Sequence, residues 1–559
     1  MRFSTRIILL VWMLFFIPPT AAQENSKPFI MPMLEAASPS SWLMGQAYGN
    51  TTGAYNFGTA WYSAGQGLHF GIDISMPCGT PLIAVADGEV IYVDNLAFGA
   101  GPHNLILRHQ QAGVTTLYGH LLDRPAVQQY QTVRQGDLVG YSGDPDVTCD
   151  SRPHLHLEVR SLDYRTAYNP VNYINAPWDA LAAVGPFNAS LFQQDWYNPR
   201  QWMTLEDQPA VAFGGARLNA YTQSWPPPGE ERPPSSAPPP RPFTPLADAP
   251  WLMRPVTFDG CCAVRWWHPT DANLLYVIDG SPGQLASIFE WDVSANAMTG
   301  LIESVPPRVL SPDGSHEMIR ANGQVSIRRL SDGGEWMVNT AGFPPAISPD
   351  NGHLLWQVQY GQSVPGATPP VVEIWVSGID GSNPRQVLVR ERISASWLDA
   401  ARLLISTTNR TLTTLSVLNI TDGSTFELGT WDRLRGLSIA PGGGRILFYQ
   451  TYQSDRSLNS VYVMETQAGA QAQALSWFGG WRWRDSESVY YIPFDPVGGQ
   501  QVLAYYHIPS GETRVLTDAA TMPFTITNGD WSVSPDGRRI VFQNAQDRRL
   551  WVMEAELAG

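Results

Sequence analysis

Positive charge is scarce in this sequence, and long apolar runs are nearly absent from it. The chain has 35 lysines and arginines but 50 acidic residues, which gives a formal net charge of −15. This balance repels the phosphates of nucleic acids and the surface of anionic lipids, so we expect no nucleic-acid partner. After the first residues, no segment is apolar over the length that a membrane-spanning helix needs.

The N-terminal residues have the pattern of a secretory signal peptide. Arg2 and Arg6 precede an apolar run, which ends at Pro18 and Pro19 and is followed by small residues up to Ala22. This order predicts a signal peptide over residues 1–22 and export of the remainder. The alternative is an uncleaved N-terminal anchor, although the apolar run is short for crossing a bilayer.

A chain of 559 residues is expected to form more than one domain. Residues 31–177 contain short β-type runs broken by glycine and no long segment with helical periodicity, which predicts a small all-β domain. Residues 178–225 mix aromatic residues with loops, and we assign them to an extension of that domain. Residues 226–250 are rich in proline, so we expect an extended spacer that separates two bodies.

Residues 251–559 contain a repeated turn followed by a β-run, as in LSPDGSHEMI, IAPGGGRILF and VSPDGRRIVF. The turns recur about every 44 residues, a spacing typical of four-stranded propeller blades. We therefore predict an all-β protein whose C-terminal part is a β-propeller of about seven blades. The last repeat stops after two predicted strands, so the residues just after Trp251 are expected to close the ring.

Only four cysteines occur in the chain. Cys78 and Cys149 flank the motifs of the first domain, and in an exported protein a disulfide between them is reasonable. Cys261 and Cys262 are adjacent, where a mutual bridge is strained, so we expect them to be reduced or paired elsewhere.

Histidines concentrate in the first domain, and two short motifs there contain ligands that suit a metal. In PHLHLEVR, the side chains of His154, His156 and Glu158 alternate with apolar residues and therefore share one face of a strand. In HFGID, His69 and Asp73 also share a face. Each motif alone has an ordinary alternative, either surface histidines or a structural His–Asp hydrogen bond.

Taken together, the two motifs supply His69, Asp73 and one histidine of the HxH pair as three ligands with a fourth position open. This is the arrangement of catalytic zinc, whereas structural zinc is closed by four ligands, usually including cysteine, which is too scarce here. No HExxH motif supplies a glutamate base, so the remaining histidines, including His120 of LYGHL, are left for proton transfer.

The motifs HxGxD, YGHL and PHLHLEV, in this order, resemble the lysostaphin/LytM family of zinc endopeptidases over roughly residues 60–176. The resemblance implies one zinc ion per peptidase domain, bound by His69, Asp73 and His156. It further implies that His120 and His154 activate water and stabilise the tetrahedral intermediate. The segment GDPDVTCDSRP departs from the small, glycine- and serine-rich loop of the family, which puts the substrate preference in doubt. The C-terminal repeats resemble TolB-like and WD-type propellers, which indicates a fold and no activity.

Three further residues have open roles, and a fourth has none. Tyr62 could donate to the oxyanion, as a loop tyrosine does in relatives, or it could pack or line the substrate groove. Glu158 could orient a ligand or be an exposed strand residue. His109 fits a surface or hydrogen-bonded strand position, and His103 is given no role.

The expected function is hydrolysis of peptides in bacterial peptidoglycan by an exported protein, located outside the cell, at the wall or in the periplasm. The propeller would bind a protein or a glycan. One alternative is an inactive wall-binding or amidase-activating scaffold, although such family members usually lack some of the five polar positions, all of which are present here. Another alternative is that the propeller carries the main function.

Overall fold

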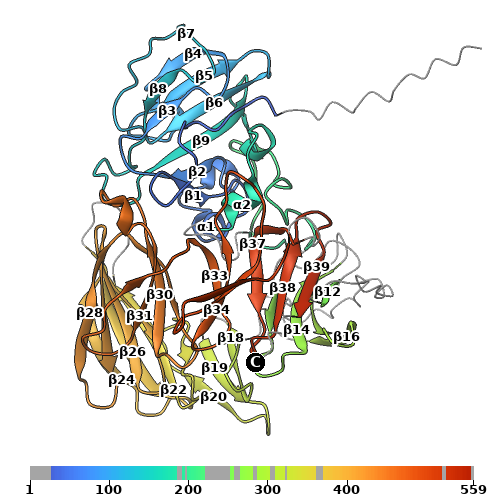
Figure 1. The fold of residues 1–559 in the computed structure, drawn as a ribbon, viewed down its shortest axis with the longest axis vertical. Coiled ribbons are helices and arrows are strands. Elements are labelled where there is room, and N and C mark those ends of the chain that lie inside the picture. Colours follow the sequence, from blue (N-terminus) through green and yellow to red (C-terminus); the bar gives the residue numbers. More distant parts are fainter. Residues whose placement is uncertain are drawn as a thin grey trace, which may run out of the picture.

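Two β-rich bodies make up the structure, which is a computed structural model (Figure 1). It describes residues 27–554, except for residues 185–191, 196–197, 221–251, 257–264, 281–285, 303–308, 322–323, 361–368 and 519–523. The N-terminal domain comprises residues 27–220, and the propeller comprises residues 252–554. The predicted signal peptide, the proline-rich spacer, and Cys261 and Cys262 lie outside the described residues. Within the described part of the chain, no helix has the length and apolar character needed to cross a membrane.

The N-terminal domain is built on an antiparallel sheet whose long strand β9 lies near its middle. In spatial order the sheet contains β1 (Leu43–Gln46), β2 (Ile72–Ser75), β9 (His154–Ser161), β6 (Val114–Gly119), β5 (Leu105–His109), β4 (Gly88–Val93) and β7 (Thr132–Val133). Strand β10 (Thr166–Tyr168) pairs with β9 and with β11 (Val211–Ala212), and β3 (Pro81–Ile83) pairs with β8 (Leu138–Tyr141). The helices are short: α1 (Thr52–Phe57), α2 (Trp178–Ala182), and the 3₁₀ turns Ser63–Gly65, Leu96–Phe98 and Pro170–Asn172.

Strand β9 separates the core of the N-terminal domain from its polar face. Leu155, Leu157 and Val159 are fully buried and belong to the main hydrophobic cluster. Burying a side chain of this size contributes roughly 1.5–3 kcal/mol, so the alternation fixes which face of the strand turns inward. The intervening side chains, including His154 and His156, consequently face the opposite side, as the sequence predicts.

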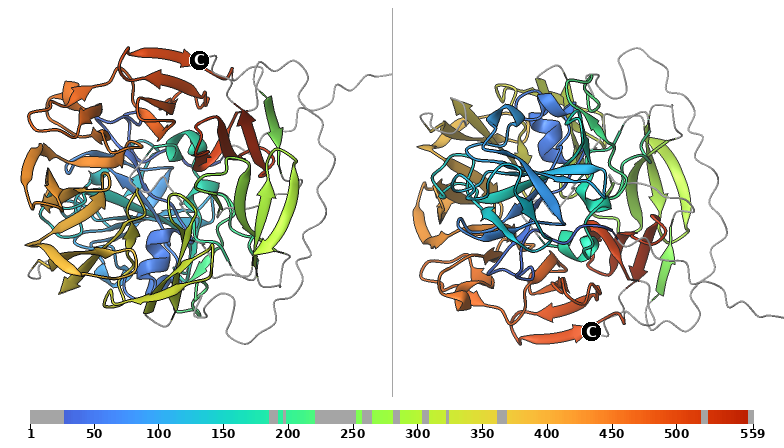
Figure 2. Two further views of the ribbon diagram at one scale, coloured as in Figure 1. Left: turned by 90° about the horizontal axis from the view of Figure 1, so that it is seen from below. Right: turned by 90° about the horizontal axis from the view of Figure 1, so that it is seen from above.

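The propeller contains seven four-stranded antiparallel sheets arranged as a ring, visible from below in Figure 2. Blade one consists of β13 (Arg265–Trp267), β14 (Leu274–Asp279), β15 (Ser287–Asp292) and β16 (Ala297–Ile302). Blade two consists of β17 (Val309–Leu310), β18 (His316–Ala321), β19 (Gln324–Arg329) and β20 (Glu335–Val338). Blade three consists of β21 (Ala346–Ile347), β22 (His353–Tyr360), β23 (Val371–Gly378) and β24 (Arg385–Glu391).

Blade four consists of β25 (Ile393–Trp397), β26 (Arg402–Asn409), β27 (Leu412–Asn419) and β28 (Thr425–Asp432). Blade five consists of β29 (Leu434–Ile439), β30 (Arg445–Gln450), β31 (Val461–Glu465) and β32 (Gln473–Ala474). Blade six consists of β33 (Gly479–Trp483), β34 (Ser488–Pro493), β35 (Ala504–His507) and β36 (Glu512–Val515). A 3₁₀ turn, Arg456–Leu458, lies in blade five.

The seventh blade combines both ends of the propeller. Strands β37 (Ile526–Val533), β38 (Arg539–Asn544) and β39 (Leu550–Glu554) are joined at the edge by β12 (Leu252–Pro255). The last repeat thus supplies three strands instead of the two that the sequence pattern indicates, because β37 is a full partner of β38. The predicted closure by the residues after Trp251 is confirmed, with Leu252 opposite Glu554 and Pro255 opposite Trp551.

The Ser-Pro-Asp-Gly turns of the propeller are structural. Ser311 donates to Asp313 at 2.7 Å, and its hydroxyl accepts from the backbone N–H of His316 at 2.9 Å. The turns at Ser348 and Ser534 repeat both bonds. Because the same side chains cap the same backbone group in each repeat, these motifs need no catalytic explanation.

The two bodies pack directly against one another, with the N-terminal domain over one end of the propeller (Figures 1 and 2). The extension that follows residue 177 provides much of this contact. Arg200 forms a two-pronged ion pair with Asp279 at 2.7 and 2.9 Å, and the side chain of Asn528 donates to the Met203 carbonyl at 2.7 Å. The expectation of two separated bodies is therefore wrong. The proline-rich composition predicts the conformation of the spacer itself, but it carries no information on whether the two bodies that the spacer joins bind each other.

Asp179 of α2 places a carboxyl group in this interface, beside β37. Burial, and then the charge of Glu206, raise its pKa to about 6. A carboxyl group whose pKa is raised on folding favours the folded state when it is protonated. The protein therefore loses folding stability as the pH rises from about 4 to 6, and this loss remains at higher pH. We expect Asp179→Asn to stabilise the protein by about 1–3 kcal/mol at pH 7.5 and to have little effect near pH 4.

Denaturant unfolding of the whole chain across pH 4–8 measures this difference. Asp123→Asn, at an exposed aspartate of the same domain, is the matched control. Parallel stability curves for Asp179→Asn and the unchanged protein would show that this carboxyl group does not oppose docking at neutral pH.

Candidate functional site

Three side chains from two strands and a preceding loop meet on the polar face of the N-terminal sheet. His69 lies just before β2, Asp73 lies on β2, and His156 lies directly opposite Asp73 on β9. His69 Nε2 is 3.3 Å from Asp73 Oδ1 and 3.3 Å from His156 Nδ1, and His156 Nδ1 is 2.8 Å from Asp73 Oδ1. The structure brings together the three predicted ligands, and their atoms are close enough to share one ion.

These separations can be tested against the dimensions of a zinc site. Ligand atoms at about 2.0–2.1 Å from zinc in a tetrahedron lie roughly 3.3 Å from one another. The three distances in the structure are 2.8, 3.3 and 3.3 Å. Two imidazole nitrogens and one carboxylate oxygen are also a donor set that zinc accepts, so the residues fit this metal.

The second nitrogen of each ligand histidine has a fixed partner. His69 Nδ1 lies 2.7 Å from the Ala47 carbonyl, and His156 Nε2 lies 3.2 Å from Glu158 Oε1. A hydrogen bond donated at the far nitrogen fixes the orientation of each ring and leaves the near nitrogen as the one that would give up its proton to a metal ion. Glu158 is therefore buried beside a ligand, and the alternative that it is an exposed strand residue is wrong.

Gly71 permits the close approach of β9 to the loop of His69. A Cβ atom at Gly71 would lie 2.5 Å from Cε1 and 2.7 Å from Nε2 of His156. No side chain can occupy that position unless the imidazole moves. The glycine of the HFGID motif thus makes room for the ring of a candidate ligand.

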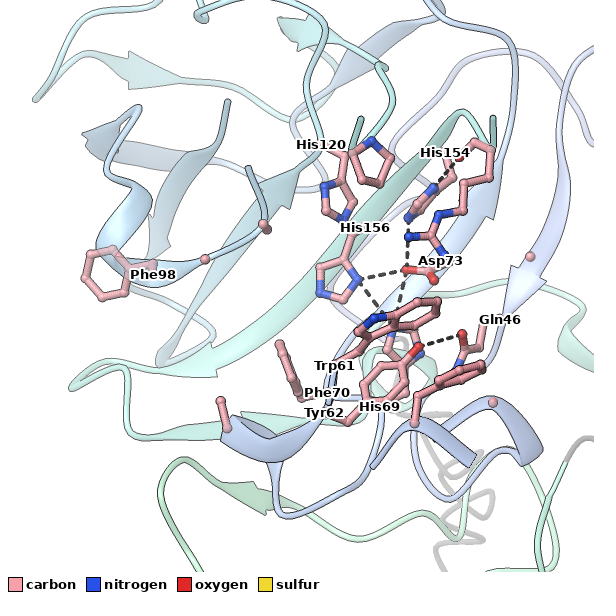
Figure 3. Close-up of a pocket in the computed structure, with 18 of the residues that line it drawn as sticks. Gln46, Trp61, Tyr62, His69, Phe70, Asp73, Phe98, His120, His154 and His156 are labelled. Carbon is pink, nitrogen blue, oxygen red and sulfur yellow. Dashed lines mark hydrogen bonds and ion pairs between the residues drawn. The ribbon is translucent and has the colours of Figure 1, made fainter. Parts of the chain in front are cut away.

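His120 and His154 lie beside the three candidate ligands. The ring centres of His120 and His154 are 4.8 Å apart, and those of His120 and His156 are 5.7 Å apart. His120 Nδ1 is held by the Gly101 carbonyl at 2.5 Å, and His154 Nδ1 by the Arg152 carbonyl at 2.7 Å. Both histidines consequently turn Nε2 toward the site, and that of His154 lies 3.7 Å from Asp73 Oδ1 (Figure 3).

The backbone at His120 is in the left-handed region, with φ 57°. This conformation is unfavourable for a residue with a Cβ atom and often occurs where a side chain must be aimed at a functional site. Its N–H donates to the Ala100 carbonyl at 2.9 Å, which holds the turn after β6. The strand therefore ends in a bend that points the imidazole into the pocket.

The buried charges of the site divide the histidines into two groups. Burial, together with His154 and His156, lowers the pKa of His120 to about 3, and burial also lowers the pKa of His154. Burial alone would lower the pKa of His156, but hydrogen bonds to Asp73 and Glu158 raise it to about 9. Burial opposes ionisation of Asp73, yet the neighbouring histidines keep its pKa well below the usual range. Without an ion His156 is therefore protonated at pH 7, and a bound cation would replace that proton beside Asp73, while His120 and His154 are neutral.

Arg160 and Tyr62 complete the polar surroundings. Arg160 donates to both oxygens of Glu158, at 2.5 and 2.9 Å, which balances the charge of this buried carboxylate. The Tyr62 hydroxyl donates to Gln46 Oε1 at 3.0 Å, and its ring lies 5.4 Å from that of His69. Burial and then the charge of Asp73 raise the pKa of Tyr62, so its hydroxyl stays protonated and able to donate. Both roles considered for Tyr62, donor and groove residue, are compatible with this position.

The site opens into a cavity of about 960 Å³ that includes all five predicted polar residues. In Figure 3, His120 and His154 lie on one side of Asp73, and Tyr62 and Gln46 on the other. Sequence reasoning missed several of the lining side chains, namely Gln46, Phe57, Trp61, Phe98, Arg152, Phe213 and Arg435. The aromatic loop before HFGID gave a signal for Trp61, but no sequence signal points to Arg435, which belongs to the propeller.

His109 and His103 lie away from the cavity. His109 is buried, with Nδ1 2.9 Å from the Asp87 carbonyl and Nε2 2.8 Å from the Thr116 hydroxyl. This is the hydrogen-bonded strand position that the sequence offered as one alternative. His103 pairs with Asp94 at 2.9 Å.

The loop that departs from the lysostaphin/LytM pattern forms one border of the cavity. Buried Asp144 accepts from the backbone N–H groups of Ser151 and Arg152, both at 3.1 Å, and so replaces glycine-rich turns with a carboxylate-centred one. Cys78 and Cys149 form a disulfide, with 5.9 Å between their Cα atoms, which ties this loop to the end of β2. The departure from the family pattern thus changes the wall of the cavity and leaves the three candidate metal ligands together.

Comparison with known proteins identifies the family of this domain. Residues 67–171 match Peptidase family M23. Glycyl-glycine endopeptidase ALE-1 of Staphylococcus capitis is 25% identical over 189 residues, which are 34% of this chain and 48% of the relative. DD-carboxypeptidase/endopeptidase Mpg of Neisseria meningitidis serogroup B is 39% identical over 94 residues, which are 17% of this chain and 20% of the relative.

Among solved structures, the catalytic domain of lysostaphin from Staphylococcus simulans is 24% identical, with a TM-score of 0.19, over 23% of this chain and 90% of that one. The chain spans less than half of the length of the two curated relatives named above. The family match includes all three candidate ligands as well as His120 and His154. Residues 67–171 therefore form a peptidase family M23 domain, which this chain combines with a seven-bladed β-propeller.

Proposed function

We propose that the N-terminal domain is a zinc-dependent endopeptidase that hydrolyses peptide bonds of bacterial peptidoglycan. The observation that carries this proposal is the convergence of two imidazole nitrogens and one carboxylate oxygen at 2.8–3.3 Å from one another. His69, Asp73 and His156 would hold the ion. When bound, zinc would acidify its water and polarise the scissile carbonyl.

The remaining side chains supply the proton transfers that amide hydrolysis requires. His120 and His154 are neutral and present Nε2 toward the site, so either can accept a proton from the attacking water. Once protonated, the same imidazole can donate that proton to the leaving amine. Tyr62, held by Gln46, keeps its hydroxyl proton and can donate to the developing oxyanion. Glu158 keeps His156 in the tautomer that binds metal.

The substrate assignment rests on the resemblance to the lysostaphin/LytM family and on the endopeptidase activities for which the relatives are named. Export through a signal peptide over residues 1–22 would place the enzyme outside the cell, at the wall or in the periplasm. The propeller would act as a binding module for a protein or glycan. An inactive scaffold is the alternative, but the presence of all five polar positions in one cavity favours catalysis.

The test combines metal analysis of the full exported chain with mass spectrometry of muropeptides released from several types of wall. We expect close to one zinc ion per chain and the appearance of newly cleaved peptide ends. Zinc binding without any cleaved peptide would support the scaffold, and absence of zinc at neutral pH would reject the enzyme altogether.

A further inference from the structure

The propeller supplies one wall of the peptidase cavity through Arg435 of β29. The guanidinium Nη1 donates to Ser75 Oγ at 3.1 Å, across 360 residues of sequence. The same guanidinium lies 5.3 Å from the ring centre of Tyr452, whose hydroxyl donates to the Ser75 carbonyl at 2.8 Å. Ser75 thus holds both propeller residues, and the arginine is fixed in place before any ligand arrives.

The position of Arg435 relative to the metal site follows from the register of β2 and β9. Ser75 lies two residues after Asp73 on the same face of β2, and it pairs with His154. Two residues of a strand span about 6.6 Å. A substrate group bound by Arg435 would therefore be only one or two residues away from the scissile bond, if the peptide binds in an extended conformation.

Arg152 adds a second guanidinium to the lining of the cavity. It lies two residues before His154 in sequence, and its guanidinium stacks 4.7 Å from the ring centre of Trp61. Throughout the described ranges, no carboxylate lies within ion-pair distance of the guanidinium of Arg152 or of Arg435. This contrasts with Arg160 in the same cavity, whose charge is matched by Glu158.

Two cavity-lining arginines without a matching acid are unexpected in a chain with a formal net charge of −15. Guanidinium groups bind carboxylates through charge-assisted hydrogen bonds, and they are most effective when they are held in advance. We propose that Arg435, assisted by Arg152, recognises a free carboxylate on the peptide substrate close to the scissile bond. This inference rests on the proposed peptidase function and makes the propeller part of substrate recognition.

The experiment uses the full zinc-loaded chain and one pair of probes. The probes are the synthetic stem peptide L-Ala-γ-D-Glu-L-Lys-D-Ala and the same peptide with its carboxylates converted to carboxamides. Binding is measured by calorimetry with His120→Ala, which is expected to bind without turnover. We expect the carboxylate form to bind about 10- to 100-fold more tightly.

Arg435→Gln, in the same background, keeps an N–H donor for Ser75 and removes the charge. It should lose most of the preference for the carboxylate form, while its binding of the carboxamide form stays unchanged. Arg433→Gln is the matched control, because Arg433 pairs with Asp432 at 2.6 Å and does not line the cavity. The control should retain the full preference.

Equal binding of the two probes, or binding of neither, overturns the carboxylate site. A preference that survives Arg435→Gln also overturns it. The enzyme proposal is tested separately with the unsubstituted chain on soluble cross-linked muropeptides. If carboxylate-dependent binding is found but no muropeptide is cut, the site stands and the peptidase proposal fails.

Discussion

Replacing His69 with alanine is expected to abolish both zinc binding and peptide hydrolysis. The substitution removes one of three ligand atoms that lie within 3.3 Å of their neighbours. A histidine and a carboxylate alone cannot complete a catalytic zinc site, and without the ion the attacking water has no activation. We expect less than a tenth of the zinc content of the unsubstituted chain and a loss of turnover of about 10³-fold or more, measured by elemental analysis and muropeptide release.

His103→Ala provides the matched control for this experiment. His103 belongs to the same domain and pairs with Asp94, but it does not line the cavity, so zinc content and turnover should be unchanged. A folded His69→Ala protein with a full complement of zinc would contradict the assignment of this ligand. Removal of the ion from the unsubstituted chain by a chelator should reproduce the loss, and added zinc should restore activity.

The alternation of polar and apolar residues in PHLHLEVR was sufficient to predict how β9 divides the core from the site. Periodicity alone could not say which histidine of the pair would join His69 and Asp73, because both lie on the same face. The register between strands decides this, since His156 is opposite Asp73 and His154 is opposite Ser75. Only the resemblance to a family carried that information at the level of sequence.

The parts that could not be predicted depend on contacts between distant elements. Arg435 reaches the cavity because the propeller docks on the N-terminal domain, and local patterns do not encode the relative placement of two bodies. Ring closure could be predicted because an incomplete final repeat requires a partner strand, which the residues after Trp251 provide. The docking surface formed by the extension has no such periodic signature, so its role became visible only in three dimensions.

His120→Ala should separate proton transfer from metal binding. His120 is not one of the three candidate ligands, and its imidazole is aimed into the cavity by a left-handed backbone and by the Gly101 carbonyl. Its removal should leave the zinc content unchanged, because His69, Asp73 and His156 keep their geometry. Loss of a positioned general base lowers turnover by roughly 10²–10⁴-fold, so we expect kcat to fall by this factor with little change in KM.

The pair of substitutions distinguishes the two roles more sharply than either alone. If His120→Ala and His69→Ala lose zinc to the same extent, the division into ligands and proton carriers is wrong. If His120→Ala retains both zinc and turnover, His154 performs the proton transfer alone, and His154→Ala should then show the loss. His154 can take this part because its Nδ1 is held by the Arg152 carbonyl, which leaves Nε2 as the proton acceptor facing the site.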